Sequence, residues 1–96
     1  MASKFHVSEL IDLSEADRNA FMADVCKVSQ AIHALYKPAK VNYGAYGDTG
    51  CHLHFHLVPK YVGGPDYPGL FRMNPQEVYL SDQEYQEMID KIKAAL

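Results

Sequence analysis

The sequence predicts an α+β fold in which a small antiparallel sheet packs with one long helix and a C-terminal helix. Three observations lead to this prediction. Apolar residues recur at helical spacing between residues 14 and 37, apolar and polar residues alternate strictly through 52–57, and a second helical stripe closes the chain. With 96 residues, we expect a single domain spanning residues 1–96. A chain of this size buries about two-thirds of its unfolded surface.

The long helix is predicted from a cap, an apolar stripe and a stop signal. Ser14, with Asp17 three residues later, resembles a capping box. Pro38 ends the pattern because proline cannot continue a helix. Cys26 falls on the apolar side, where we expect a buried free thiol. The stripe that should pack on the sheet consists of Phe21, Val25, Val28, Ile32 and Leu35.

Two strands are predicted to pair as an antiparallel hairpin. Residues 41–46 form the first strand, and the glycine-containing turn at 47–50 leads into the second. In the second strand, Leu53, Phe55 and Leu57 alternate with polar residues. Because successive side chains of a strand point to opposite faces, these three residues should face the core.

A loop and a second helix follow the hairpin. Residues 63–69 are too rich in glycine and proline for a helix or a central strand. The loop either covers a functional site or reaches a second subunit, with Tyr67, Phe71 and Arg72 as candidate contacts, or it is an ordinary surface connector. Ser81 and Glu84 form a second capping box. The apolar stripe of the helix that begins there is Tyr85, Met88, Ile89, Ile92 and Leu96.

Composition excludes several classes of function. The net charge of −3 argues against a protein that binds nucleic-acid polymers, which would carry a basic stripe. No run of about 18 apolar residues is present, so we expect no membrane partner. The N-terminus lacks the apolar core of a signal peptide. The two cysteines form no recognisable disulfide framework, and reduced thiols in the cytoplasm are the simplest interpretation.

Three of the five histidines, His52, His54 and His56, occupy alternate positions and so share one strand face. The outer two Cα atoms should be about 13 Å apart on a regular strand. Zinc ligands must converge to within roughly 4 Å of one another, so a regular strand would stretch a three-histidine site. A linear row fits an extended phosphoryl substrate better. We therefore favour phosphoryl chemistry and predict no metal site.

The run from His52 to Val58 matches the His-x-His-x-His-x-x signature, with x apolar, and resembles the histidine-triad (HIT) superfamily. Members of that superfamily hydrolyse or transfer nucleotides. The resemblance covers roughly residues 4 to 61 and is closest to the branch in which a short proline-rich tail and a final helix follow the triad. The supporting matches are Lys4–Val7 leading to Leu13-Ser14, Val41–Tyr43 before the glycine-rich turn, and Pro59–Tyr61.

The resemblance implies a nucleotide hydrolase or nucleotidyl transferase that acts at the α-phosphate of phosphoramidates or dinucleoside polyphosphates. His54 aligns with the family's nucleophile, which forms a covalent nucleotidyl-histidine. His52 and His56 align with the histidines that orient the nucleophile and contact phosphate oxygens. Asn42 matches, loosely, an asparagine near the ribose or the phosphates. The glycine-rich turn that contains Gly50 offers backbone amides to a phosphate.

The expected partner is a nucleotide or nucleotide conjugate. No cofactor is required, although a divalent cation could accompany the substrate phosphates. Family members commonly dimerise, and a short chain with an unpaired sheet edge has added reason to do so. We therefore expect a homodimer, with domain exchange as a second form.

Two departures from the family pattern bear on activity. Asp48 stands where members usually carry glutamine, and a carboxylate there would repel phosphates unless it points away or binds a cation. Typical members also have several strands and a fourth histidine before the segment that resembles Lys4–Val7. We therefore expect an N-terminally short domain: a truncated form, a natural short form, or a subunit whose missing wall comes from a partner. We assign His6 no catalytic role.

Two alternatives to an active enzyme follow from these departures. The first is a catalytically weak or inactive nucleotide-binding or interaction module. The second is a metal-binding protein in which two triad histidines combine with Cys51 or Asp48.

Overall fold

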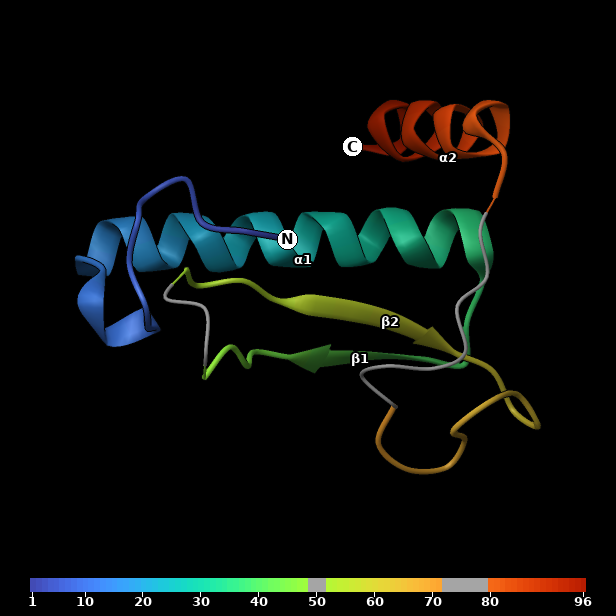
Figure 1. The fold of residues 1–96 in the computed structure, drawn as a ribbon, viewed down its shortest axis with the longest axis horizontal. Coiled ribbons are helices and arrows are strands. Elements are labelled where there is room, and N and C mark those ends of the chain that lie inside the picture. The colour runs from blue at the N-terminus through green and yellow to red at the C-terminus, as the bar shows by residue number, and fades with distance from the viewer. Residues whose placement is uncertain (49–51, 72–79) are drawn as a thin grey trace.

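The computed structural model describes residues 1–48, 52–71 and 80–96. Helix α1 lies between a two-stranded antiparallel sheet and helix α2, so the molecule has three layers (Figure 1). This arrangement confirms the predicted α+β fold. The elements in order are the 3-10 turn η1 (Leu10–Asp12), α1 (Glu15–Tyr36), β1 (Lys40–Gly44), β2 (His56–Lys60) and α2 (Asp82–Ala95).

Helix α1 begins and ends at the signals that the sequence contains. The Ser14 hydroxyl accepts a hydrogen bond from the backbone N–H of Asp17 at 3.2 Å. At the other end Lys37 adopts a left-handed conformation with φ of 48°, and its N–H donates to the His33 carbonyl at 3.1 Å. Pro38 follows directly. These caps satisfy backbone groups that the helix itself leaves unpaired.

The core forms between α1 and the segment that leads into β2. Phe21 and Val25 of the helix pack with Leu53 and Phe55. The rings of Phe21 and Phe55 meet edge to face, with centroids 5.7 Å apart. Leu53 and Phe55 are buried, whereas the three histidines that alternate with them are partly exposed. The predicted alternation of a core face and a polar face is therefore confirmed.

The prediction of a buried thiol at Cys26 is wrong. Cys26 is exposed, and its thiol forms no disulfide among the described residues. The preceding residue, Val25, has only 1% of its surface exposed. One step along an α-helix turns the side chain by about 100°. That rotation takes Cys26 out of the stripe that faces the core.

Strands β1 and β2 pair as predicted, but their bounds differ from the predicted ones. Lys40 lies opposite Lys60, and Gly44 lies opposite His56. The first strand thus starts one residue before the predicted range and ends two residues before its end. Of the three triad histidines only His56 belongs to β2.

The two faces of the sheet have different surroundings. Val41 is buried, and the Tyr43 hydroxyl lies 2.7 Å from the hydroxyl of Ser29 on α1. Alternation places Asn42 on the opposite face, together with His56 of the neighbouring strand. One face of the sheet therefore packs against α1, and the other carries the polar row.

The segment formed by residues 1–7 runs beside the triad segment and acts as an irregular third strand. The backbone of Met1 exchanges two hydrogen bonds with Phe55, each of 2.7 Å. The N–H of Ser3 donates to the Leu53 carbonyl at 3.0 Å. The residues before β2 are thus held by the N-terminal segment rather than by β1.

Helix α2 packs on α1 on the side away from the sheet (Figure 1). The predicted capping box is present: the Ser81 hydroxyl accepts from the Glu84 N–H at 3.2 Å, and the Glu84 carboxylate accepts from the Ser81 N–H at 3.1 Å. Most of its apolar stripe remains exposed, namely Tyr85, Met88, Ile89 and Leu96. Within the described ranges, no helix is both long and apolar enough to cross a membrane.

Candidate active site around the histidine row

The structure places the three predicted catalytic histidines in one row, opposite the buried Leu53 and Phe55. The rings of His54 and His56 meet edge to face, with centroids 5.1 Å apart. His54 precedes β2 and forms an isolated antiparallel bridge with Ala2. His52 lies two residues earlier, beside Ser3. The row is therefore built from β2 and from a segment that the N-terminal residues hold in place.

A backbone carbonyl sets the orientation and tautomer of His54. Its Nδ1 lies 2.9 Å from the carbonyl oxygen of His52. Because a carbonyl oxygen only accepts hydrogen bonds, Nδ1 must carry the proton and donate it. In the neutral imidazole the other nitrogen, Nε2, then has a free lone pair. This is the protonation state that a nucleophile requires.

The N-terminal segment orients His52 in the same way. Its Nε2 lies 2.6 Å from the Ser3 carbonyl oxygen, so this nitrogen donates. The ring also meets that of His6, with centroids 5.2 Å apart. The sequence predicts no catalytic role for His6, yet the structure places its ring next to that of His52. The only local signal was its extended Phe5-His6-Val7 context, which does not reveal a pairing across more than forty residues.

His56 lies among aromatic rings. Its centroid is 6.1 Å from that of Tyr46 and 6.3 Å from that of Phe71. The Nε2 atom is buried and has no hydrogen-bond partner within the part of the chain that the structure describes. An unsatisfied buried polar atom of this kind costs about 1–3 kcal/mol. A substrate atom that hydrogen-bonds Nε2 would remove that cost.

Because Phe71 lies beside His56, the end of the loop after β2 reaches the histidine row. The sequence does not single out Tyr46 as a site residue, because its strand-like pattern fits a packing residue as well as a functional one. Arg72, another predicted contact of this loop, lies outside the described residues.

Asn42 is on the histidine face, but its side chain contacts Lys60 rather than an imidazole. The Oδ1 atom accepts a hydrogen bond from Lys60 Nζ at 3.3 Å. Gly50, the predicted phosphate-binding position in the turn, lies outside the described residues. Asn42 therefore lies on the same face of the sheet as His56.

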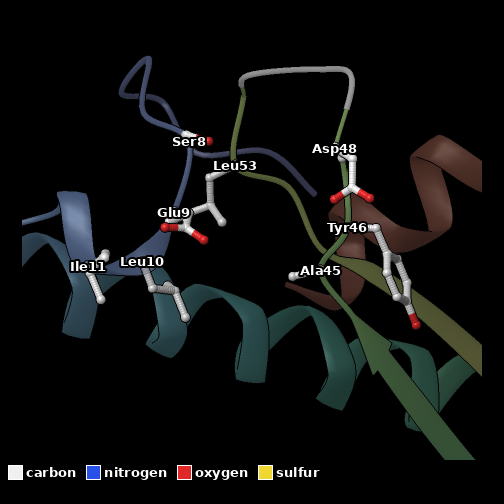
Figure 2. Close-up of a pocket in the computed structure, with 9 residues that line it drawn as sticks. Ser8, Glu9, Leu10, Ile11, Ala45, Tyr46, Asp48 and Leu53 are labelled. Carbon is white, nitrogen blue, oxygen red and sulfur yellow. The ribbon is translucent and has the colours of Figure 1, made fainter.

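A cavity of about 470 Å³ lies between residues 8–11 and the loop after β1 (Figure 2). Glu9 and Asp48 carry carboxylates on opposite sides of it. From the triad segment Leu53 contributes to the lining, and its side chain points to the face opposite the imidazoles. The carboxylates make this cavity unfavourable for phosphates. Asp48 therefore lines this acidic cavity.

The metal-binding alternative gains no support from the described residues. Among them, no group of three or more His, Cys, Asp and Glu side chains could hold a metal ion. The version that combines two triad histidines with Asp48 is therefore not formed. Cys51, the ligand in the other version, lies outside the described residues.

Comparison with known proteins gives a consistent family. The model of the HIT domain matches residues 1–63. A histidine triad protein from Bradyrhizobium japonicum is 26% identical, and its crystal structure superposes with a TM-score of 0.83 over 94% of this chain and 67% of its own. No curated protein matches the chain.

Two further crystal structures share the fold. Histidine triad proteins from Sinorhizobium meliloti and Marinobacter aquaeolei are each 21% identical and superpose over 94% of this chain, with TM-scores of 0.85 and 0.84. The matched parts make up 67% and 66% of those chains. The chain thus spans about two-thirds of the length of these related structures.

Proposed function

The chain belongs to the HIT family, a superfamily of nucleotide hydrolases and transferases, and on this basis we propose that it acts at the α-phosphorus of a nucleotide conjugate. The observation that carries the proposal is the hydrogen bond from His54 Nδ1 to the His52 carbonyl, at 2.9 Å. This bond leaves the Nε2 lone pair free to attack phosphorus.

The proposed reaction has two steps. His54 Nε2 attacks the α-phosphorus, a bond from nitrogen to phosphorus forms, and the bond to the leaving group breaks. Water or another acceptor then attacks the same phosphorus, releases the nucleotide and restores the imidazole. Covalent catalysis of this type divides one difficult displacement into two easier ones.

The other two histidines support these steps in the proposal. His56 Nε2, buried and unpaired among the described residues, would hydrogen-bond a phosphate or leaving-group oxygen. His52 would hold the His54 ring through its carbonyl. Asn42 and the turn that contains Gly50 remain proposed contacts of the substrate.

The proposed substrates are nucleotide phosphoramidates and dinucleoside polyphosphates. Hydrolysis through His54 needs no cofactor of its own, and a divalent cation would arrive with the substrate phosphates. We further propose a homodimer, because β1 has one strand partner and an open outer edge in the described sheet. A cytoplasmic location fits a chain with two cysteines and no disulfide framework.

The test is intact-mass spectrometry after mixing the protein with adenosine 5′-phosphoramidate, together with measurement of adenosine monophosphate release. We expect a transient adenylyl adduct and product from the parent protein. In His54→Ala the adduct should vanish and turnover should fall by about three orders of magnitude or more. His33→Ala is the matched control, because this histidine is exposed on α1, and it should retain the parent activity.

One result of this experiment would contradict the proposed enzymatic activity. A folded parent protein that binds the nucleotide but yields neither adduct nor product would overturn the enzymatic proposal. The protein would then be a nucleotide-binding module that keeps the triad without turnover.

A further inference from the structure

Lys60 is a buried lysine on the same face of the sheet as the imidazoles. Only 3% of its surface is exposed. Its Nζ donates to the Gly69 carbonyl at 2.7 Å and to Asn42 Oδ1 at 3.3 Å. Both acceptors are neutral, and within the described residues the ammonium forms no ion pair. Burial of a cation without a counter-charge is unfavourable, so the position favours a bound anion.

A cavity of about 290 Å³ borders this ammonium. Lys40 also lines it and is exposed, which brings a second positive charge. The Oδ1 of Asn42 already accepts from Lys60, so the amide nitrogen of Asn42 presents its two N–H donors elsewhere. The other lining residues, none of which carries a carboxylate, are Ala39, Tyr67, Pro68 and Gly69. The charged side chains of the described lining are thus both cationic.

The strand register places this cavity on the face of the histidine row. Lys40 pairs with Lys60 and Gly44 pairs with His56, so all four positions share one side of the sheet. Lys60 follows His54, the proposed nucleophile, by six residues, which corresponds to about 20 Å along a regular strand. Its Nζ reaches back toward the row, because it contacts Asn42, which lies opposite Val58. Gly69, in the loop after β2, lines the cavity.

We propose that Lys60, Lys40 and the Asn42 amide form an anion site that binds a phosphate group remote from the reacting phosphorus. An extended substrate with its α-phosphorus at His54 would place a later phosphate of its leaving group toward Lys60. The substrate class favoured by this site is a nucleotide conjugate with at least one additional phosphate. This assignment of substrate rests on the proposed function, whereas the anion site itself does not.

The site is tested first with inorganic pyrophosphate as the probe, by titration followed with nuclear magnetic resonance. We expect the largest shifts at the Asn42 side-chain amide and the Gly69 backbone amide. Lys60→Met should weaken binding about ten- to hundred-fold, the range for charge-assisted hydrogen bonds, and Lys60→Arg should retain most of it. Lys91→Met, which removes one exposed positive charge on α2, should bind like the parent.

Because Lys60 is buried, Lys40→Met provides a second variant whose folding is not in question. It should also weaken pyrophosphate binding, by a smaller factor than Lys60→Met. Equal binding by the parent, Lys60→Met and Lys40→Met would overturn the proposal. So would shifts confined to the histidine rings, or no binding at millimolar pyrophosphate. In those cases Lys60 only anchors the loop through Gly69.

A kinetic comparison separates this proposal from the proposed function. Lys60→Met should raise KM for a dinucleoside polyphosphate about ten-fold or more and leave KM for adenosine phosphoramidate unchanged. A KM that rises equally for both substrates would overturn the assignment of substrate. If the parent turns over neither substrate but binds pyrophosphate through Lys60, the enzymatic proposal falls and the anion site stands as a site for free phosphate.

Discussion

Val25 and Cys26 are neighbours on α1 with opposite environments. Val25 packs in the core with 1% of its surface exposed, and Cys26 is exposed. Val25→Ala removes two methyl groups from a packed site and should lower the free energy of unfolding by about 2 kcal/mol. Cys26→Ala should change it by no more than about 0.5 kcal/mol. Urea denaturation of both variants measures the two changes in the free energy of unfolding. Equal destabilisation would contradict the placement of Val25 in the core and of Cys26 at the surface.

At the scale of residues, the sequence predicts which face of a strand a side chain occupies, because this depends only on the local pattern. Alternation alone places His52, His54 and His56 on one face, opposite Leu53 and Phe55. It does not reveal contacts made across long stretches of chain. The Ser3 carbonyl that holds His52 is 49 residues away in sequence. The burial of Lys60 likewise depends on a loop that returns to the sheet, and lysine is a residue type that is usually exposed.

Helix α2 depends on its caps more than α1 does. None of its residues is buried, so its packing contributes less to keeping it helical. Ser81→Ala removes the capping box and should cost about 1 kcal/mol. Hydrogen exchange should then show about five-fold faster exchange of α2 amides, while α1 amides keep their protection.

Gln83→Ala is the matched control for this experiment. Gln83 is exposed within α2, and its side chain makes one hydrogen bond, of 3.3 Å, to Glu87. Alanine is a good helix former, so the control should leave exchange close to that of the parent. If exchange rises equally in α1 and α2 of Ser81→Ala, the two helices open as one unit. That result would contradict the prediction that α2 depends on its cap more than α1 does.

The elements differ in how well the sequence predicts their ends. Both helices start at a serine cap, and α1 stops just before Pro38, because these signals act locally. The strand bounds shift because the residues before β2 pair with residues 1–7 instead of β1. No local pattern indicates which of two possible partners an extended segment will choose.

The molecule as a whole is less compact than its length allows. The radius of gyration is 14.7 Å, compared with about 12.5 Å expected for a compact domain of this size. The buried apolar side chains of the described residues are few, and they are Phe21, Val25, Ala31, Ile32, Val41, Leu53 and Phe55. A small core of this kind leaves a narrow margin of stability.

The open edge of β1 and the small core together favour association of two copies. If the folded form is a homodimer, mass action makes its stability depend on protein concentration. Raising the concentration about 100-fold above the dissociation constant should add up to about 2.7 kcal/mol. For a domain of this size, that corresponds to a rise in Tm of about 10 °C or more. Thermal unfolding at two concentrations, with sedimentation equilibrium on the same samples, measures both quantities. A concentration-independent Tm together with the mass of one chain would show that the protein is a monomer and that no second copy contributes to the site.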